Sequence, residues 1–303
     1  MAQLTMDDLM FRPGLMQGQR ILITGGGTGL GKAMAEACLM LGAEVYICGR
    51  RGGVLDDTAK ELMDAHGGRM VGIPCDIRVP EAIDEMLDRI WADGGALTGL
   101  VNNAAGNFIS RTEDLSPRGF DAIANIVFRG SFFVTLGCGK RWLAEGKKAS
   151  VVSILTTWIW NGGPFTVPSA MSKAGINIMG QSLAVEWGGR GIRFNSIAPG
   201  PFPTEGMSAR LNPTATQDMS ETARPGNPMG RVGEMRELAN LAVYLLHPLS
   251  EYVNGQTIAI DGGAWNAGGG GFAALRSWTD EQWKAARDSI RATNEKDRAQ
   301  RTV

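Results

Sequence analysis

Short, nearly continuous apolar runs alternate along the chain with longer stretches of helical periodicity, from about residue 20 to residue 261. Most of the short runs do not alternate with polar residues, which is typical of strands buried on both faces of a parallel sheet. The runs that we assign to strands are Ile21–Thr24, Glu44–Cys48, Met70–Pro74, Gly99–Asn102, Ser150–Leu155, Arg193–Ile197 and Thr257–Ile260. The helical stretches between them are Leu30–Leu41, Asp56–His66, Pro80–Trp91, Pro117–Leu143, Ser169–Gly188 and Glu234–His247.

This alternation predicts an α/β fold, namely a Rossmann-type doubly wound parallel sheet in three αβα layers. We expect a single domain over residues 20–264, preceded by an N-terminal extension over residues 1–19. Within the domain, the segment from about 199 to 230 follows a strand and is rich in Pro, Gly, Ser and Thr. It is too long for a simple connection, and we interpret it as a lid over a substrate site.

A glycine-rich hinge and a C-terminal helix are predicted over residues 265–303. The helix extends from about 280 to 296, and Thr279 and Gln282 form a capping box at its start. Two interpretations of this helix stay open: its apolar face packs against the body or a second subunit, or the segment is a frayed tail.

The composition narrows the function classes. With 30 Lys and Arg against 31 Asp and Glu, the formal net charge is −1, which argues against a nucleic-acid or anionic-membrane partner. The two histidines and four cysteines are widely spaced and form no CxxC pair, so we expect no metal site, no Ser-His-Asp triad and reduced thiols. Since no apolar run approaches about 18 residues and the first residues suit no targeting peptide, we expect a soluble cytoplasmic protein.

A glycine-rich turn lies between the first strand and the first helix. Glycine allows positive φ and a close approach of the backbone to a pyrophosphate, and the following helix adds free N–H groups. The alternative is a tight structural turn. The residues that we assign to a dinucleotide site here are Gly25, Gly27, Thr28, Gly29, Leu30 and Gly31.

The end of the second strand indicates which dinucleotide binds. NAD-binding folds place Asp or Glu there to hold the ribose 2′-OH, whereas this chain has Arg50 and Arg51. Two guanidiniums suit a 2′-phosphate through charge-assisted hydrogen bonds, so the cofactor predicted is NADP(H). The alternative is a pair of solvated surface arginines.

Several motifs of the chain resemble those of the short-chain dehydrogenase/reductase family. The resemblance implies that Asp76 holds the adenine ring, that Asn103 belongs to the cofactor site, and that Pro199, Gly200 and Phe202 flank the nicotinamide. The matching stretches are Thr24–Gly31 (TGGGTGLG), Asn102–Gly106 (NNAAG), Pro199-Gly200 and Asp261-Gly262-Gly263.

The catalytic motif departs from this family. The family pattern is Ser followed by Tyr-x-x-x-Lys; here Lys173 is present, Ser169 stands at the tyrosine position, and Thr156 stands at the serine position. The asparagine of the preceding helix is replaced by Val127. A phenol exchanges protons with an alkoxide far more readily than an aliphatic hydroxyl does. Ordinary alcohol–ketone chemistry therefore loses its proton carrier.

One subgroup of the family, the 2,4-dienoyl-CoA reductases, carries Ser-x-x-x-Lys, and the chain resembles its mitochondrial type. Such enzymes reduce a conjugated acyl-CoA with NADPH, while negative charge collects on the thioester oxygen. The matching stretches are Asn102–Ser110, Leu115–Pro117, Val167–Ser169, Leu183–Gly188, Pro199–Pro201 and Glu281–Trp283.

The subgroup resemblance implies roles for single residues. Lys173 would hold the nicotinamide ribose, Asn107 would donate to the thioester oxygen, and Ser169 would support the same network. Asn107 as a turn residue and Ser169 as a helix cap are the alternatives. The positions implied to contact acyl-CoA are Arg78, Phe108, Ser116 and Arg210. The two arginines would bind CoA phosphates, and the alternative is that they form surface salt bridges.

The subgroup resemblance has one gap. The mitochondrial enzymes carry a catalytic tyrosine where this chain has Ile159, and the peroxisomal enzymes use an aspartate where it has Val127. Trp158 and Trp160 either offer an indole N–H or line an apolar pocket; a bound water is a third proton source. If they line the pocket, a bulkier enoyl or aryl thioester is the expected substrate.

Three functions are weighed on this basis. The leading one is an NADPH-dependent reductase of a conjugated C=C bond in an acyl-CoA, of the 2,4-dienoyl-CoA or enoyl-CoA type, in fatty acid metabolism. The others are an NADP-dependent carbonyl reductase with an atypical proton donor and a catalytically reduced NADP-binding module. The family resemblance also implies a homotetramer.

Overall fold

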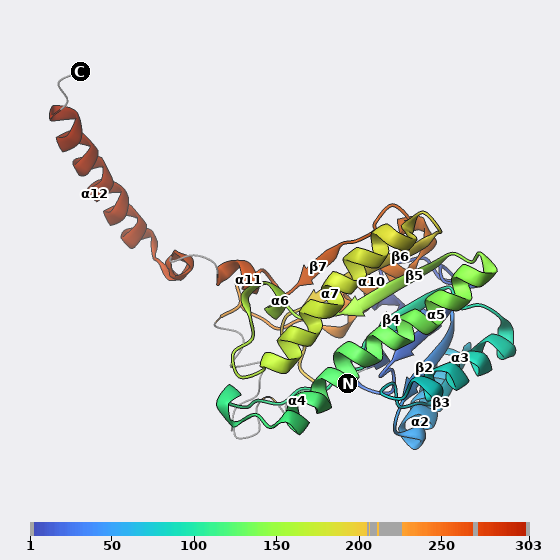
Figure 1. The fold of residues 1–303 in the computed structure, drawn as a ribbon. Helices are drawn as coiled ribbons and strands as arrows, with labels where there is room; N and C mark the ends of the chain where they lie inside the picture. Colours follow the sequence, from blue (N-terminus) through green and yellow to red (C-terminus); the bar gives the residue numbers. More distant parts are fainter. Residues whose placement is uncertain (1–2, 205, 207–210, 212–225, 269–271, 301–303) are drawn as a thin grey trace. The chain divides into compact units, whose positions relative to one another are not determined.

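Seven parallel strands form the centre of the computed structural model, which describes residues 3–204, 206, 211, 226–268 and 272–300 (Figure 1). The strand order is β3-β2-β1-β4-β5-β6-β7, so the winding direction reverses between β1 and β4. The bounds are β1 (Arg20–Thr24), β2 (Glu44–Gly49), β3 (Arg69–Pro74), β4 (Gly99–Asn102), β5 (Ala149–Ile154), β6 (Ile192–Pro199) and β7 (Thr257–Ile260). Every residue of β1, β4, β5 and β6 is buried, and the predicted doubly wound sheet is confirmed.

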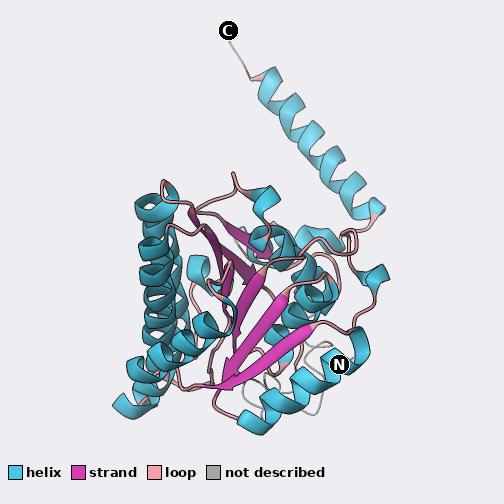
Figure 2. Ribbon diagram, turned by 90° about the vertical axis from the view of Figure 1, so that its right-hand side faces the viewer, coloured by secondary structure: helices cyan, strands magenta, loops and turns pink. Residues whose placement is uncertain are grey.

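Helices cover both faces of this sheet, which gives the three predicted layers (Figure 2). On one face, α1 (Gly29–Met40), α2 (Gly52–His66) and α10 (Met235–Leu246) pack into one hydrophobic cluster. On the other face, α3 (Pro80–Gly94), α5 (Ser131–Glu145) and α7 (Val167–Gly188) pack into a second cluster. Alternating strands and helices therefore bury both faces of the sheet.

The predicted helix at 117–143 is continuous to Glu145 and contains a π-helical segment. It consists of α4 (Pro117–Ala124), the π-helix Asn125–Gly130 and α5. By length and composition alone it is apolar enough to cross a membrane, but half of its apolar window is buried inside the fold. Val134, Cys138 and Trp142 of α5 are completely buried in the second cluster, as expected of a core helix.

The N-terminal segment, predicted as an extension, belongs to the hydrophobic core. Leu4, Leu9 and Met16 are buried in the first cluster. The backbone N–H of Leu4 donates to the buried carboxylate of Glu36 in α1, at 3.1 Å. The segment therefore packs against α1 as part of the sheet unit.

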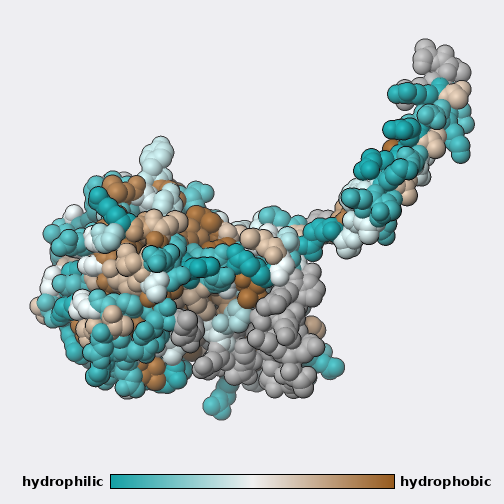
Figure 3. Space-filling model, turned by 180° about the vertical axis from the view of Figure 1, so that it is seen from behind, coloured by the Kyte–Doolittle hydropathy of each residue, from teal (hydrophilic) through white to brown (hydrophobic). Residues whose placement is uncertain are grey.

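The chain divides into two compact units, residues 1–263 and 264–303. The second unit contains α11 (Ala264–Ala267), a short 3-10 helix and α12 (Asp280–Ala299), which begins where predicted. The predicted capping box is confirmed, since Thr279 N–H donates to Gln282 Oε1 at 2.8 Å and Thr279 Oγ1 accepts from the Gln282 N–H at 3.4 Å. The surface of α12 is largely hydrophilic (Figure 3).

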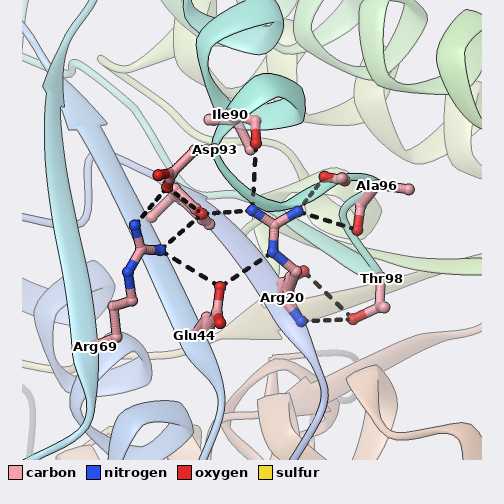
Figure 4. A network of polar contacts seen from close by, with 9 residues as sticks. Arg20, Glu44, Arg69, Ile90, Asp93, Ala96 and Thr98 are labelled. Carbon is pink, nitrogen blue, oxygen red and sulfur yellow. Dashed lines mark hydrogen bonds and ion pairs between the residues drawn. The ribbon is translucent and has the colours of Figure 1, made fainter.

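A polar network ties the amino ends of the first three strands to the end of α3 (Figure 4). The Tyr46 hydroxyl donates to Asp93 at 2.7 Å and accepts from Arg69 at 3.0 Å and from Arg20. Burial, followed by the hydrogen bond to Asp93, raises the pKa of Tyr46. The guanidinium of Arg20 is buried and also pairs with Glu44 at 3.1 Å. The network satisfies a charge that would otherwise be costly to bury.

Replacing Tyr46 with Phe should lower the free energy of unfolding by about 1–3 kcal/mol, because buried guanidinium donors lose their acceptor while the ring is kept. Chemical denaturation of the two proteins measures the difference. Tyr252→Phe is the matched control, since this tyrosine is fully exposed and its hydroxyl should contribute almost nothing. Equal stabilities for Tyr46→Phe and the unchanged protein would contradict a structural role of the network.

Candidate active site

A cavity of about 1020 Å³ opens at the carboxyl ends of the strands, where ligands bind in open α/β sheets. Most of the residues predicted from the sequence line it. They are Gly25, Gly27, Thr28, Gly29, Leu30, Arg50, Arg51, Asp76, Asn103, Asn107, Thr156, Trp158, Ser169, Lys173, Pro199, Gly200 and Phe202. The structure thus brings together side chains that lie up to about 180 positions apart in the sequence.

The floor of the cavity is a cross-link between the ends of β1 and β4. The Thr24 hydroxyl accepts from the backbone N–H groups of Asn103 at 3.0 Å and Ala104 at 2.9 Å. In return, the Asn103 amide donates to the carbonyls of Thr24 at 2.9 Å and Gly25 at 3.2 Å. The turn that follows β1 is therefore held against the turn that follows β4.

The glycines of this turn are required by its geometry. Gly25 and Gly29 have φ of +66° and +57°, which L side chains rarely adopt. A Cβ on Gly31 would lie 2.4 Å from the carbonyl oxygen of Gly25 and 2.5 Å from the Asn103 amide nitrogen. Gly31 therefore shapes the turn from beneath and does not itself line the cavity.

Arg50 and Arg51 line the cavity directly after β2, and both are exposed. Asp76 lines it after β3, and its carboxylate is held by the Arg78 guanidinium, with Nε 2.9 Å from Oδ1. This hydrogen bonding lowers the pKa of Asp76, and the nearby charge of Arg50 adds to the effect. An anion that binds in this part of the site would therefore meet two guanidiniums, beside a carboxylate that is held in place.

The opposite part of the cavity contains the catalytic candidates. Ser169 and Lys173 are one turn apart on α7, and both are buried. The Lys173 ammonium donates to the carbonyl of Ile154, while burial lowers its pKa to about 8. The cap of α7 is Thr166, so Ser169 is not the helix cap, and within the described chain its hydroxyl makes no hydrogen bond.

Asn107 follows β4 and presents its amide to the same space. Its Oδ1 accepts from the backbone N–H of Phe108 at 2.9 Å, an arrangement typical of a turn residue. The bond also fixes the orientation of the side chain and leaves the amide NH₂ as donor toward the cavity that Asn107 lines. The two interpretations of Asn107 are therefore compatible.

Apolar packing occupies the positions where relatives were expected to carry an acid. Val127 is completely buried, and Ile159 is packed in the same small cluster as Val127 and Phe108. Among the described residues that line the cavity there is no tyrosine, histidine or glutamate, and Asp76 lies at the end near Arg50. The hydroxyl-bearing residues Ser169, Thr156 and Thr157 line the same cavity as Lys173.

Four predicted substrate residues do not line the cavity in the described structure. Arg78 is paired with Asp76, Phe108 packs in the apolar cluster, and Ser116 caps α4 by accepting from Gly119 N–H at 3.1 Å. Trp160 is 39% exposed, whereas its neighbour Trp158 does line the cavity. Arg210 and most of the predicted lid lie outside the described residues.

Sequence reasoning missed several lining residues, among them Ile109, Ile126, Leu155, Thr157, Pro164 and Thr166. Most of them directly follow β4 or β5, or precede α7. Loops that follow parallel strands converge at one edge of the sheet. Their position after the predicted strands was therefore the signal available, although their side chains carry no motif.

The site fits a phosphorylated dinucleotide. Its glycine turn leaves room that a Cβ would fill, the N-terminus of α1 adds a positive partial charge, and two guanidiniums follow β2. Lys173 lies at the other end of the same cavity. Within the described chain, no group of three or more His, Cys, Asp or Glu is placed to hold a metal ion.

Comparison with known proteins agrees with the assignment of this cavity to an oxidoreductase. A family described as enoyl-(acyl carrier protein) reductase matches residues 25–264. The chain is 40% identical to a probable (3E)-enoyl-CoA-producing 2,4-dienoyl-CoA reductase of Caenorhabditis elegans, over 96% of this chain and 95% of that protein. It is 37% identical to a probable (2E)-enoyl-CoA-producing 2,4-dienoyl-CoA reductase of Bacillus subtilis (82% and 98%). The structure superposes on a short chain dehydrogenase from Bacillus anthracis with a TM-score of 0.75 and 36% identity (82% and 97%).

Replacing Thr24 with Val should weaken dinucleotide binding and lower the free energy of unfolding by about 1–3 kcal/mol. Valine keeps the shape, but two backbone N–H groups lose their acceptor. Calorimetric titration with the dinucleotide and chemical denaturation measure both effects. Thr24→Ser is the control because it keeps the hydroxyl, and a similar loss in both variants would show that the hydrogen bonds are not the cause.

Proposed function

The chain belongs to the short-chain dehydrogenase/reductase family of oxidoreductases, which bind a nicotinamide cofactor, and we propose that it reduces a conjugated C=C bond of an acyl-CoA with NADPH. The observation that carries this proposal is the set Asn107, Ser169 and Lys173 around one cavity whose described lining has no phenol. The names of the relatives support a 2,4-dienoyl-CoA as the substrate.

NADPH is proposed over NADH because of the charges after β2. Arg50 and Arg51 line the cavity where a carboxylate would be needed for the ribose 2′-OH. Two exposed guanidiniums lose little hydration when they bind a 2′-phosphate, and each makes charge-assisted hydrogen bonds to it. Lys173 would hold the nicotinamide end, beside Pro199 and Phe202.

When bound, the reduced nicotinamide supplies a hydride. Asn107 is proposed to donate its amide to the thioester oxygen, where negative charge increases as the conjugated system accepts the hydride. The hydrogen bond from Phe108 N–H keeps that amide oriented, so little reorganisation is needed. The hydroxyl of Ser169, in the first turn of α7, is proposed as a second hydrogen-bond donor beside the Asn107 amide.

A water is proposed to protonate the carbon. The hydroxyls of Thr156, Thr157 and Ser169 line the cavity next to the Lys173 ammonium, and such a group of donors and acceptors suits an ordered water. Protonation of the dienolate forms a C–H bond, breaks an O–H bond of the water and produces no alkoxide, and the proton is replaced from solvent. The absence of a phenol from the described lining therefore does not oppose this reaction. The same absence leaves a carbonyl reductase without specific support.

Arg78 is proposed to contact a CoA phosphate, which would compete with Asp76 for its guanidinium. Its side chain is 41% exposed, so a phosphate can reach it. The role proposed for Arg210 and the place in fatty acid metabolism come from the sequence resemblance, whereas the cytoplasmic location is proposed from the four widely spaced cysteines.

A homotetramer is proposed from the family and from one surface of the fold. Met171, Ile178 and Val185 recur at intervals of seven on α7 and are 57%, 60% and 86% exposed. Phe128 and Phe132 add exposed rings on the helix beside it. An exposed apolar stripe of this kind marks an interface, and light scattering of the purified protein tests the assembly.

Purified protein should oxidise NADPH in the presence of 2,4-dienoyl-CoA, followed by cofactor absorbance. Asn107→Ala should lower kcat about 10²–10³-fold, because one donor to a developing oxyanion is lost. Asn294→Ala in the exposed part of α12 is the control. No oxidation with a broad panel of dienoyl- and enoyl-thioesters would contradict the proposed function.

Arg50→Ala combined with Arg51→Ala should raise KM for NADPH about 10²- to 10⁴-fold and leave KM for NADH nearly unchanged. Each charge-assisted hydrogen bond to the 2′-phosphate contributes about 1.5–3 kcal/mol, and NADH does not make it. The control is Arg190→Ala, an exposed arginine of another surface. A preference for NADH in the unchanged enzyme would refute the assignment.

A further inference from the structure

Phe165 has a backbone conformation that a bulky residue rarely adopts. Its φ is +62°, and among the described residues no other residue except glycine has a positive φ. This left-handed conformation is unfavourable for an L-residue because Cβ comes too close to the following carbonyl oxygen. Strain of this kind persists only where the surrounding structure enforces it, and it concentrates at functional sites.

The surroundings of Phe165 hold its backbone in place. The carbonyl of Phe165 accepts from the N–H of Ser110 at 2.9 Å, which joins the loop before α7 to the loop after β4. The Thr166 hydroxyl donates to the carbonyl of Gly163 at 3.2 Å. A Cβ on Gly163 would meet that hydroxyl at 2.8 Å. The segment therefore makes a tight turn whose shape leaves Phe165 no relaxed alternative.

Packing of the Phe165 ring does not repay the strain. The residue is 61% exposed, and on its inner side it borders a small second cavity. A buried phenylalanine stabilises a fold by removing its apolar surface from water, but an exposed one contributes little. The unliganded fold thus bears a cost for which it gains almost no burial.

Phe165 stands between two residues that line the active-site cavity, although it does not line that cavity itself. The residues on both sides of it, Pro164 and Thr166, line that cavity. So does Ile109, which is 46% exposed and precedes the Ser110 that holds Phe165. The hydrogen bond from Ser110 to Phe165 joins the two loops that carry Ile109 and Phe165, and we call this pair of residues the apolar rim.

We propose that the apolar rim covers the part of a long or bulky acyl group that projects from the cavity, so that Phe165 selects substrates by their apolar length. This inference rests on the proposed function, because it takes an acyl-CoA as the ligand. The cavity also has to hold a dinucleotide, and in this proposal an extended acyl group leaves it past Ile109, which lines the cavity and is 46% exposed. Burial of the ring against the ligand would then repay the strain.

Saturated acyl-CoAs of about four, ten and sixteen carbons differ in the apolar surface that they can bury. Calorimetric titration with each of them tests the selection without turnover. In the unchanged protein, affinity should rise with chain length. In Phe165→Ala, the affinity for the longest chain should fall about tenfold, as one aromatic contact is lost, while that for the shortest stays the same. Leu249→Ala, at an exposed leucine of the 3-10 helix Pro248–Ser250, is the matched control.

Phe165→Gly separates the ring from the strain. It should lose chain-length selection as Phe165→Ala does, but melt at a temperature about 2 °C higher than Phe165→Ala, because glycine accepts positive φ. The same length dependence in Phe165→Ala and in the unchanged protein would overturn the inference. If dienoyl-CoA is nevertheless reduced, the proposed function stands; if acyl-CoA binds with selection but no thioester is reduced, the proposed function fails and the rim stands.

Discussion

The hydrogen-bonded cross-link between Thr24 and Asn103 is the constraint on which the rest of the site depends. It connects the ends of β1 and β4, the two strands between which the winding of the sheet reverses. At such a reversal the following loops diverge and leave a crevice, so something must fix the width of that crevice. The Thr24 hydroxyl and the Asn103 amide do this with four hydrogen bonds to backbone groups. Gly31 lets α1 approach this cross-link closely.

Charge is distributed unequally along the cavity. At one end, Arg50 and Arg51 are exposed and ready for an anion. At the other end, Lys173 is buried, and burial lowers its pKa to about 8, so the protein bears a desolvation cost there. The carbonyl of Ile154 offsets part of that cost. A polar ligand group next to Lys173 would offset more of this desolvation cost. Cofactor binding would then also stabilise the buried ammonium of the reaction centre.

The fold and the cofactor end of the site were predictable, because they depend on local patterns. Apolar runs gave the strands to within about two residues at most ends, and the glycine turn and Arg50 occupy fixed places after β1 and β2. The substrate end was less predictable. Phe108 was expected in the site by resemblance, and Trp160 was expected there as a pocket-lining or proton-donating residue. Neither lies among the described residues that line the cavity, and Phe108 packs in an apolar cluster. Side chains on loops take directions that depend on tertiary packing, and no periodicity records them.

The two ends of the cavity are also built from different material, and this affects how specificity can change. The cofactor end consists of strand ends and a helix N-terminus, joined by backbone hydrogen bonds that no single surface substitution replaces. Near the substrate end, Val127 of the π-helix Asn125–Gly130 and Ile159 of α6 (Trp158–Asn161) pack in one apolar cluster at the positions where the resemblance led us to expect an acid. An acid there would need a partner or water, because burying an unpaired carboxyl is costly. Apolar residues remove that requirement and pack behind Leu155, which lines the cavity. An apolar cluster behind the cavity wall fits the proposed reduction of a conjugated C=C bond in an apolar acyl group, a reaction that forms no alkoxide.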